Sequence, residues 1–280
     1  MKKAQFLKVF ISMVLALVMV CGTSIPVFAT EADDELVVTS SYNPFTTTAN
    51  NTSRSIIGKD DRDIITDTDA SPYAAIAYLS ISYSCGCGAT GTGFMISKNC
   101  MLTAGHCIIC TDHGNEASSI TAWFGYKSSS DYLLRKTATP NDSVIYHDPN
   151  YTGSQKNYDY GYVVFNTNVG NTTGWFGMAS RNDSTLDGMN INVTGYRYGV
   201  MYDCVGEITS VTNKRIKYDA DTEPGQSGSP VYFNDSTYGN LAVGIHTTGT
   251  DVLNWKNSGW RITSEFINHL ADLGYVTKVS

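Results

Sequence analysis

The sequence predicts an all-β protein with one helix at its C-terminal end. Short runs rich in Val, Ile, Tyr and Thr recur between turn-forming Gly, Asn, Asp and Ser residues. The clearest runs are Ala74–Ser82, Gly93–Ser97, Gly161–Phe165, Ile191–Thr194, Ser229–Phe233 and Leu241–His246. Many short strands at this spacing are typical of a β-sandwich or a β-barrel.

The segment Thr263–Gly274 departs from this pattern and has the spacing of an amphipathic helix. Thr263 or Ser264 can cap its first turn, and Gly274 stands where a helix end favours glycine. The apolar residues expected on one face are Phe266, Ile267, Leu270 and Leu273. We therefore expect a single C-terminal helix packed on a β domain.

Residues 1–29 have the layout of a secretory signal peptide. Lys2 and Lys3 precede the apolar run Val9–Cys21, and the small residue Ala29 follows Val27 and Phe28. A membrane anchor is the alternative, but the run is shorter than the roughly 20 residues that span a bilayer. We expect cleavage after Ala29 and a secreted, extracellular product without stable membrane insertion.

Residues 30–54 are rich in Thr, Ser, Asn and acidic residues and poor in apolar ones, so we expect them to be largely disordered. Arg54 lies directly before Ser55 and the apolar pair Ile56–Ile57. A removable propeptide cut after Arg54 explains this arrangement, and a plain flexible tail is the alternative. Residues 55–280 are long enough for one well-cored domain or two small fused halves.

The net charge of −7 and the scattered Lys and Arg argue against a nucleic-acid partner, which would attract a basic patch. Cys21 leaves with the signal peptide, so the mature chain keeps Cys85, Cys87, Cys100, Cys107, Cys110 and Cys204. An even number in an exported protein favours disulfides, whose pairing stays open. A zinc site is the rival, because His113 lies near two cysteine pairs with ligand-like spacing, Cys85 with Cys87 and Cys107 with Cys110.

Small residues flank Ser227 in the segment Gly225–Pro230. A tight loop of this composition can expose the Ser227 hydroxyl and direct backbone N–H groups inward. The N–H groups of Gly225 and Ser227 are candidates to bind an oxyanion, where one donor lowers the barrier by about 3 kcal/mol. Taken alone, the segment could equally be a flexible turn.

A serine hydroxyl is a poor nucleophile until a base takes its proton. His106 is the candidate base, since it follows a β-rich run and has small neighbours; a core histidine is the alternative. A third group must fix the tautomer of that base. Asp159 lies between two tyrosines just before a strand, and is favoured over Asp142 and Asp148 in polar turns.

Three segments, Thr103–Cys107, Asn157–Gly161 and Gly225–Pro230, occur in the order His, Asp, Ser and resemble those of chymotrypsin-like serine proteases. The resemblance is greatest to the glutamyl endopeptidases of Gram-positive bacteria, and it extends from about Ser55 to the C-terminal helix. It implies a double β-barrel, with halves of about 55–168 and 169–280 and the active site between them.

The resemblance also assigns roles to individual residues. It implies a catalytic triad of His106, Asp159 and Ser227. Leu241–Gly249 is similar to the family segment that lines the S1 pocket, where a histidine at the place of His246 and a threonine like Thr222 bind a glutamate carboxylate. A structural strand residue is the alternative for His246. A His near its normal pKa would make substrate binding depend on pH.

Activation is implied by the same resemblance. The N-terminus freed at Ser55 is expected to help shape S1, so that the cut after Arg54 creates both activity and acid preference. Gln226 replaces the aspartate with which many chymotrypsin-like enzymes anchor that N-terminus. Two further departures are Glu223, whose carboxylate could repel an acidic substrate, and Gly91, which stands where the usual disulfide partner of Cys107 is expected.

The sequence thus predicts a secreted, monomeric zymogen that hydrolyses proteins or peptides after Glu, with Asp as a further candidate. No cofactor and no metal is expected. One alternative is the same chemistry with another P1 preference. Others are a non-catalytic binding module on the same fold, although all three triad residues are present, and a zinc-stapled adhesion domain.

Overall fold

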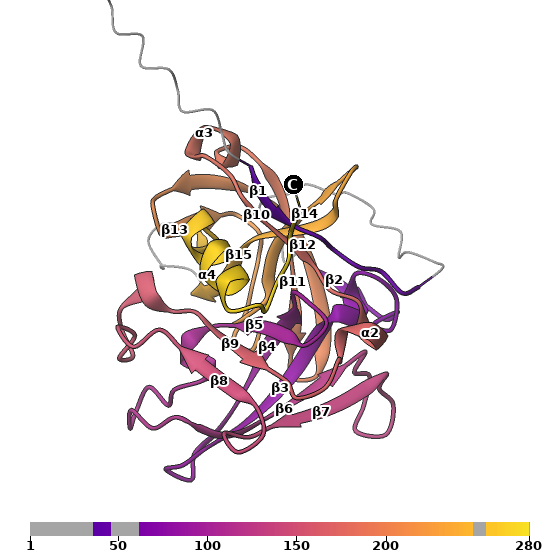
Figure 1. Ribbon diagram of the computed structural model, residues 1–280, viewed down its shortest axis with the longest axis vertical. Coiled ribbons are helices and arrows are strands. Elements are labelled where there is room, and N and C mark those ends of the chain that lie inside the picture. Colours follow the sequence, from indigo (N-terminus) through magenta and orange to yellow (C-terminus); the bar gives the residue numbers. More distant parts are fainter. Residues whose placement is uncertain (1–35, 46–61, 249–255, 280) are drawn as a thin grey trace, which may run out of the picture. The chain divides into compact units, whose positions relative to one another are not determined.

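The computed structural model describes residues 36–45, 62–248 and 256–279, which belong to one compact unit, Leu36–Ser280. Within these ranges the chain forms two barrel-like sheets and a few short helices (Figure 1). The predicted all-β class with a C-terminal helix is confirmed. The expected signal peptide, the cut after Arg54, and Ser55 lie outside the described residues.

The first sheet contains seven strands from one continuous stretch of chain. They are β3 (Ile76–Tyr83), β4 (Gly88–Met95), β5 (Cys100–Thr103), β6 (Ala117–Phe124), β7 (Leu134–Ala138), β8 (Val144–His147) and β9 (Gly161–Val164). Their spatial order is β7–β6–β3–β4–β5–β9–β8. The connections contain the short 3-10 helices η1 (Tyr73–Ala75), η2 (Gly105–Cys107) and η3 (Lys156–Tyr158).

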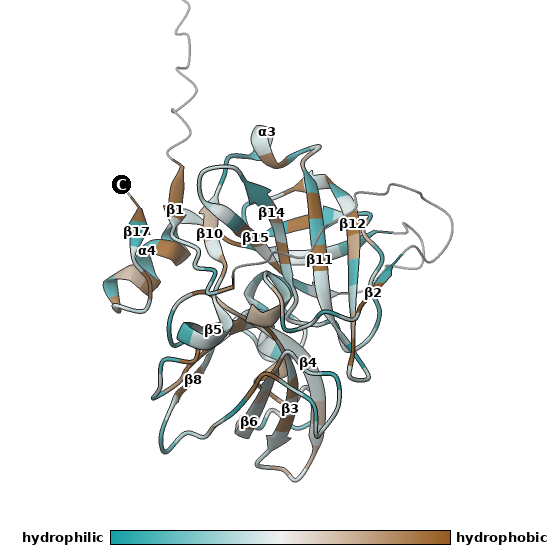
Figure 2. Cartoon of the chain, turned by 90° about the vertical axis from the view of Figure 1, so that its right-hand side faces the viewer, coloured by the Kyte–Doolittle hydropathy of each residue, from teal (hydrophilic) through white to brown (hydrophobic). Residues whose placement is uncertain are grey.

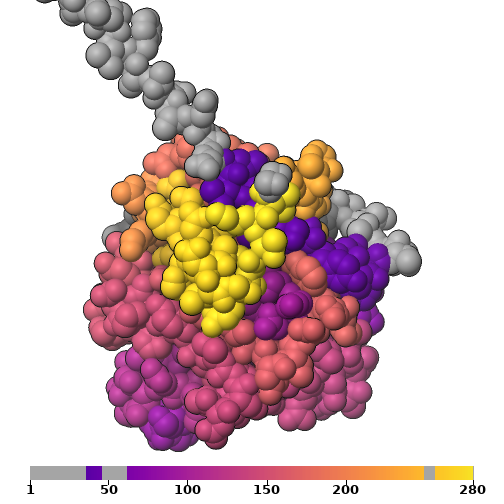
Figure 3. All heavy atoms as spheres, in the orientation of Figure 1, coloured from indigo at the N-terminus to yellow at the C-terminus, as the bar shows by residue number. Residues whose placement is uncertain are grey.

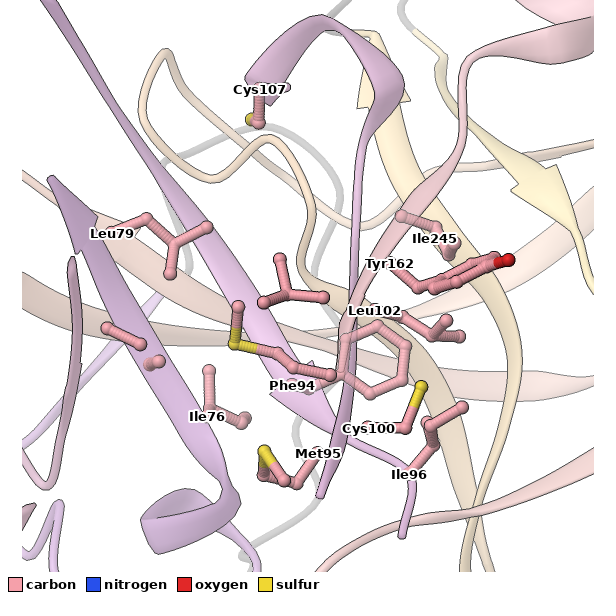
Figure 4. Packing of buried hydrophobic residues seen from close by; sticks show 14 of the residues in the cluster. Ile76, Leu79, Phe94, Met95, Ile96, Cys100, Leu102, Cys107, Tyr162 and Ile245 are labelled. Atoms are coloured by element: carbon pink, nitrogen blue, oxygen red, sulfur yellow. The ribbon is translucent and has the colours of Figure 1, made fainter. Parts of the chain in front are cut away.

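The core of the first sheet is apolar and fully enclosed. Ile76 on β3, Phe94 on β4 and Leu102 on β5 have no exposed surface. Figure 4 shows them packed together with Tyr162 of β9 and with Ile245, which belongs to the second sheet. This continuous packing fixes the ends of β5 and β9 relative to the second sheet.

The second sheet contains ten strands. They are β1 (Val37–Thr39), β2 (Asp63–Ile65), β10 (Gly177–Ser180), β11 (Asn190–Arg197), β12 (Val200–Val211), β13 (Arg215–Tyr218), β14 (Pro230–Asp235), β15 (Gly239–Thr248), β16 (Asn257–Arg261) and β17 (Lys278–Val279). Strands β14–β11–β12–β13–β16–β15 form a ring that the β14–β15 pairing closes. Figure 2 shows alternating hydrophilic and hydrophobic bands along β11 and β12, as expected for strands with one buried face.

Strand β1 comes from the segment expected to be disordered, and that expectation is wrong for residues 36–45. β1 pairs with β10 on one side and with β17 on the other. Val38 and Thr39 are only 2% and 1% exposed, and the Thr39 hydroxyl accepts the Met178 N–H at 2.8 Å. Backbone pairing on both edges compensates for the small number of apolar side chains in this segment.

The helices are α2 (Gly170–Thr173), α3 (Asp183–Leu186) and α4 (Ser264–Asp272), and α4 lies on the surface beside β1 (Figure 3). Thr263 Oγ1 accepts the N–H of Phe266 at 3.4 Å, and Gly274 has φ +74° just past the helix, so both predicted ends are confirmed. Phe266, Ile267 and Leu270 are buried. Leu273, predicted on the same face, is 45% exposed because it lies beyond the last helical turn.

Candidate active site

The pairing of β5 with β9 brings His106 and Asp159 together. The two strands are antiparallel, with Thr103 opposite Gly161. His106 lies in η2 just after β5, and Asp159 lies between η3 and β9. The end of one strand therefore meets the start of its neighbour, and the two side chains need only short connections to reach each other.

Asp159 holds His106 through three contacts. The imidazole Nδ1 lies 2.9 Å from Oδ2 and 3.1 Å from Oδ1, and the backbone N–H of His106 donates to Oδ1 at 2.9 Å. Asp159 is only 3% exposed. A carboxylate at Nδ1 places the ring proton there, which leaves Nε2 as a proton acceptor.

The loop that carries Ser227 is docked on the same turn. The carbonyl of Ser227 accepts the N–H of Thr92 at 2.8 Å and the thiol of Cys107 at 3.7 Å. Gly228 has φ +90°, and a Cβ there would collide with the Thr92 carbonyl and the Thr103 hydroxyl. Ser227 is thus held against Cys107, the residue that follows His106.

Two backbone N–H groups of this loop remain available. Gln226 donates to Glu223 O at 3.1 Å and Gly228 donates to His246 O at 2.7 Å. Among the described residues, however, no carbonyl accepts the N–H of Gly225 or of Ser227. These are the two donors expected to bind an oxyanion.

Thr92 on β4 shapes this loop, and sequence reasoning missed it. Its hydroxyl accepts the N–H of Tyr196 at 2.9 Å and donates to the carbonyl of Gly225 at 3.1 Å. Its carbonyl in turn accepts the Thr103 hydroxyl at 2.7 Å. Thr92 therefore connects both sheets to the loop, and no motif in the sequence marks a single Thr for such a role.

His246 is buried on β15, next to the Ser227 loop. It is 2% exposed, and its Nδ1 lies 2.6 Å from the hydroxyl of Tyr218. Burial, with smaller contributions from His106 and Arg215, lowers the pKa of His246 to about 3. His246 therefore does not meet the condition of a near-normal pKa under which substrate binding would depend on pH, because the imidazole has no solvent to stabilise its charged form.

Thr222 presents a second polar group near the loop. Its hydroxyl is buried and has no hydrogen-bond partner among the residues that the structure describes. A buried hydroxyl without a partner costs free energy, about 1–3 kcal/mol, unless a ligand supplies the missing bond. The Thr222 hydroxyl is thus suited to receive a polar substrate group.

The carboxylate of Glu223 is occupied by arginines. Glu223 Oε2 lies 2.7 Å from Arg62 NH2 and 2.6 Å from Arg197 Nε. Gln226, which is fully buried, accepts from Arg62 NH1 at 3.4 Å. Two cations thus compensate the Glu223 charge. Arg62, which lies just before β2, also contacts Gln226 through its guanidinium group.

Arg215 is a further residue that sequence reasoning missed. NH1 donates to the Lys156 carbonyl at 2.8 Å and to the Thr247 hydroxyl at 2.9 Å, and NH2 donates to the Ser258 hydroxyl. Burial lowers the pKa of Arg215, while the Asp159 charge opposes this effect. Arg215 therefore ties the connection before Asp159 to β15 and β16.

The rival carboxylates have other partners. Asp148 is 7% exposed rather than in an open polar turn, and it accepts the Tyr160 hydroxyl at 2.7 Å. Asp142 accepts the Thr139 N–H at 3.0 Å within its own turn. In the described ranges neither carboxylate contacts a histidine, and His147 Nδ1 lies 2.9 Å only from the backbone carbonyl of Asp148. Asp159 is thus the partner of His106.

The expectation of disulfides is not met, since no disulfide joins any two of the described cysteines: Cys85, Cys87, Cys100, Cys107, Cys110 and Cys204. A Cβ added to Gly91 would lie 2.7 Å from Cys107 Sγ. This proximity agrees with the expectation that Gly91 stands where the usual disulfide partner of Cys107 would be. Cys107 instead donates to Ser227 O, and burial raises its pKa to about 12. A thiol in this environment stays protonated.

Comparison with known proteins assigns the class. A family model for the trypsin-like peptidase domain matches residues 91–245. A solved structure described as Glu endopeptidase in complex with MPD superimposes with a TM-score of 0.64 at 26% identity, covering 79% of this chain and 99% of that chain. The fold and the site thus define a serine endopeptidase of the trypsin-like class.

Two curated relatives narrow the assignment. The glutamyl endopeptidase of Bacillus licheniformis is 34% identical over 229 residues, covering 78% of this chain and 69% of the relative. A protein of Bacillus subtilis named extracellular metalloprotease is 38% identical over 222 residues, covering 77% of this chain and 68% of the relative. The chain belongs to the glutamyl endopeptidase family. In the part of the chain that the structure describes, no helix is long and apolar enough to cross a membrane.

Proposed function

We propose that this endopeptidase uses Ser227 as its nucleophile, His106 as its base and Asp159 as the group that orients the base. The observation that carries this proposal is the buried Asp159 carboxylate at 2.9 Å from His106 Nδ1. Docking of the Ser227 loop on the Cys107 side of the same turn supports it.

In the proposed reaction, Ser227 Oγ attacks the scissile carbonyl while His106 Nε2 takes its proton. The oxyanion accepts the N–H groups of Gly225 and Ser227, each worth about 3 kcal/mol of barrier. The intermediate collapses, His106 gives its proton to the departing amine, and an acyl-enzyme remains on Ser227. Water then attacks with His106 again as base, which releases the acid and restores the hydroxyl.

We propose cleavage after Glu, with Asp as a further P1 residue. Burial raises the pKa of Tyr218, so its hydroxyl keeps its proton, and in the tautomer that we propose it donates to Nδ1 of His246. The neutral ring then carries its own proton on Nε2, as a donor for a substrate carboxylate. The free Thr222 hydroxyl offers a second donor. Arg62 and Arg197 compensate the negative charge of Glu223, which reduces its repulsion of an acidic substrate side chain.

We further propose a secreted, monomeric zymogen that is cut after Arg54 and acts on proteins or peptides outside the cell. The leader-like residues 1–29 support export. The word extracellular in the name of the Bacillus subtilis relative supports the same location. Arg62, which follows the expected new N-terminus at Ser55, contacts Gln226 and Glu223, so a cut upstream can influence this loop.

The first experiment tests the nucleophile. Ser227→Ala should reduce kcat on a denatured protein by at least about 10⁴-fold while leaving the fold intact. The matched control is Ser229→Ala in the same loop, whose hydroxyl donates only to Gln226 O. Persistence of activity in Ser227→Ala would refute the assignment. An unmodified chain without peptidase activity would instead support a non-catalytic module.

The unmodified chain also tests a second candidate mechanism, in which a metal ion performs the hydrolysis. The name of the Bacillus subtilis relative raises this candidate. A serine-directed phosphonylating reagent should inactivate the enzyme with one label on Ser227. A metal-dependent reaction would instead survive the reagent, with Ser227 unlabelled, and would be lost when a chelator removes the metal.

The second experiment tests specificity with a peptide library whose cut sites are mapped by mass spectrometry. Cuts should be enriched after Glu. Thr222→Ala should lower kcat/KM for Glu peptides about tenfold relative to Gln peptides, as for loss of one hydrogen bond to a charged group. Thr209→Ala, on exposed β12 surface, is the control. Cuts without acidic enrichment would refute the glutamyl preference but leave the peptidase chemistry intact.

A further inference from the structure

Three cysteines and a histidine gather at one edge of the first sheet, in a cluster that the proposed reaction does not use. They are Cys85, Cys87, Cys110 and His113, and their sulfur and ring-nitrogen atoms all lie within 4.8 Å of one another. His113 Nδ1 lies 3.5 Å from Cys87 Sγ and 3.5 Å from Cys110 Sγ. Four potential ligand atoms are thus gathered in one small volume.

Two tight turns produce this convergence. Cys85 and Cys87 flank Gly86 in the turn between β3 and β4, where the Gly86 N–H donates to Tyr83 O at 3.0 Å. Gly86 has φ +87°, a conformation that favours glycine.

The second turn carries the other two ligands. Cys110 O accepts the N–H of Gly114 at 2.7 Å, and Gly114 has φ +68° directly after His113. The residues Cys110 and His113 therefore project from the same side of one backbone turn. Each turn supplies two ligands, which is the usual construction of small structural zinc sites.

The distances fit a tetrahedral ion better than a disulfide. With Zn–S of about 2.3 Å and Zn–N of about 2.0–2.1 Å, tetrahedral angles put sulfur and nitrogen about 3.6 Å apart. The two sulfur-to-nitrogen distances are both 3.5 Å. A disulfide between two of the three cysteines would leave the third sulfur and the imidazole without a role.

We propose that Cys85, Cys87, Cys110 and His113 bind one zinc ion as a closed, structural Cys₃His site. On binding, the three thiols release their protons and His113 binds as the neutral imidazole through Nδ1. Three thiolates and one divalent ion leave a net charge of −1. With four protein ligands, no coordination position remains for water or substrate.

The ion would fasten the β3–β4 turn to the loop that positions His106. Tyr83, at the end of β3, already donates its hydroxyl toward the carbonyls of His106 and Cys107 at 3.4 Å. On the other side, the Ile109 N–H donates to Gly105 O at 3.1 Å within the turn that precedes Cys110. Both polypeptide segments that meet at the ion therefore also support the η2 turn.

The direct test is metal analysis of the purified full chain, prepared with Ser227→Ala to prevent self-digestion. Elemental mass spectrometry should find about one zinc per chain after dialysis against a weak chelator. Replacement by Co²⁺ should give the intense visible d–d bands and sulfur-to-metal charge-transfer bands of tetrahedral thiolate cobalt. Neither readout depends on peptidase activity, so the zinc proposal and the catalytic proposal can fail separately.

Matched variants assign the ligands. Cys110→Ser and His113→Ala should reduce bound zinc from about one per chain to near zero, whereas His113→Cys should retain it as a Cys₄ site. The controls Cys204→Ser, in the second sheet, and His269→Ala, on exposed α4, should keep full zinc content.

The opposing result is equally clear. Absence of zinc and cobalt binding in the unmodified cysteine set, together with a mass lowered by two hydrogens and a disulfide-linked peptide among Cys85, Cys87 and Cys110, would overturn the proposal. Zinc retained by both Cys110→Ser and His113→Ala would also overturn it.

Discussion

The Tyr218 hydroxyl lies 2.6 Å from Nδ1 of His246, and both side chains are buried in the second barrel. Burial keeps the phenol protonated and the imidazole neutral, so the tautomer of His246 decides which of the two donates this bond. In the proposed S1 role the phenol donates, and the far ring nitrogen carries the proton. The direction of this one hydrogen bond decides whether His246 offers a donor or an acceptor to the substrate.

Tyr218→Phe should therefore weaken acid selectivity without abolishing the reaction. Loss of the orienting bond should lower kcat/KM for a Glu peptide about tenfold, about 1.4 kcal/mol, with a smaller effect on its Gln analogue. Tyr232→Phe, which alters another buried hydroxyl of the same barrel, near Thr194, is the control. An unchanged Glu-to-Gln ratio in Tyr218→Phe would contradict the assigned direction.

His246 should also make stability depend on pH. Its pKa is about 3 in the native protein and near 6.5 when unfolded, so between these values the unfolded chain binds the extra proton. Stability should fall as pH decreases from about 6.5 toward 3, by about 2–3 kcal/mol over the first two pH units. Urea unfolding of Ser227→Ala at several pH values would measure this slope.

His246→Gln in that background should reduce the slope, whereas His269→Gln, on exposed helix surface, should not. Asp203 contributes with the opposite sign, since burial raises its pKa to about 6 from 3.8, but it is present in all three proteins. A slope that is equal in the His246 variant and its parent would mean that this imidazole titrates normally in the native state.

The arginines around Glu223 should be needed for acidic substrates in particular. Arg62→Ala removes one of the two cations on that carboxylate, and we expect kcat/KM for Glu peptides to fall about tenfold while Gln peptides change less. Adding Glu223→Gln should restore most of the loss, because the uncompensated charge disappears. No recovery in the double variant would show that Arg62 acts through packing instead.

Gly91→Cys should form a disulfide with Cys107. The added Cβ would lie 2.7 Å from Cys107 Sγ, close to bonding geometry, and the Gly91 backbone does not have a positive φ. Closing a loop of about 15 residues should stabilise the fold by up to about 3 kcal/mol. Under reductant the thermal midpoint should drop again. Gly91→Ser, of similar size but unable to form the bond, should instead be destabilised, and a free-thiol count that rises by one in Gly91→Cys would refute the pairing.

The sequence predicts well those features that local residues determine. Short runs rich in Val, Ile, Tyr and Thr between turn residues predicted the strands around Phe94 and Ile245, and Thr263 with Gly274 predicted the ends of α4. The contact between His106 and Asp159 was predicted from the order and surroundings of the two residues, and their strands do pair side by side.

Other features depend on contacts between distant segments and carry no local signal. Thr92, Arg215 and Tyr218 carry no sequence signal for their roles. The fold places Thr92 against Gly225, Tyr218 against His246 and Arg215 between Lys156 and Thr247. Cysteine spacing suggested both a metal and disulfides, but only the folded turns show Cys85 and Cys110 next to the same histidine. The pKa of His246 likewise depends on burial that the sequence does not reveal.

Strand β1 has a consequence for maturation. A cut after Arg54 breaks one peptide bond, yet β1 remains hydrogen-bonded to β10 and β17, with Val38 enclosed. The fragment upstream of the cut then supplies a strand of the second sheet. The processed enzyme would be a nicked, two-fragment complex that migrates as one species under native conditions and separates only when denatured.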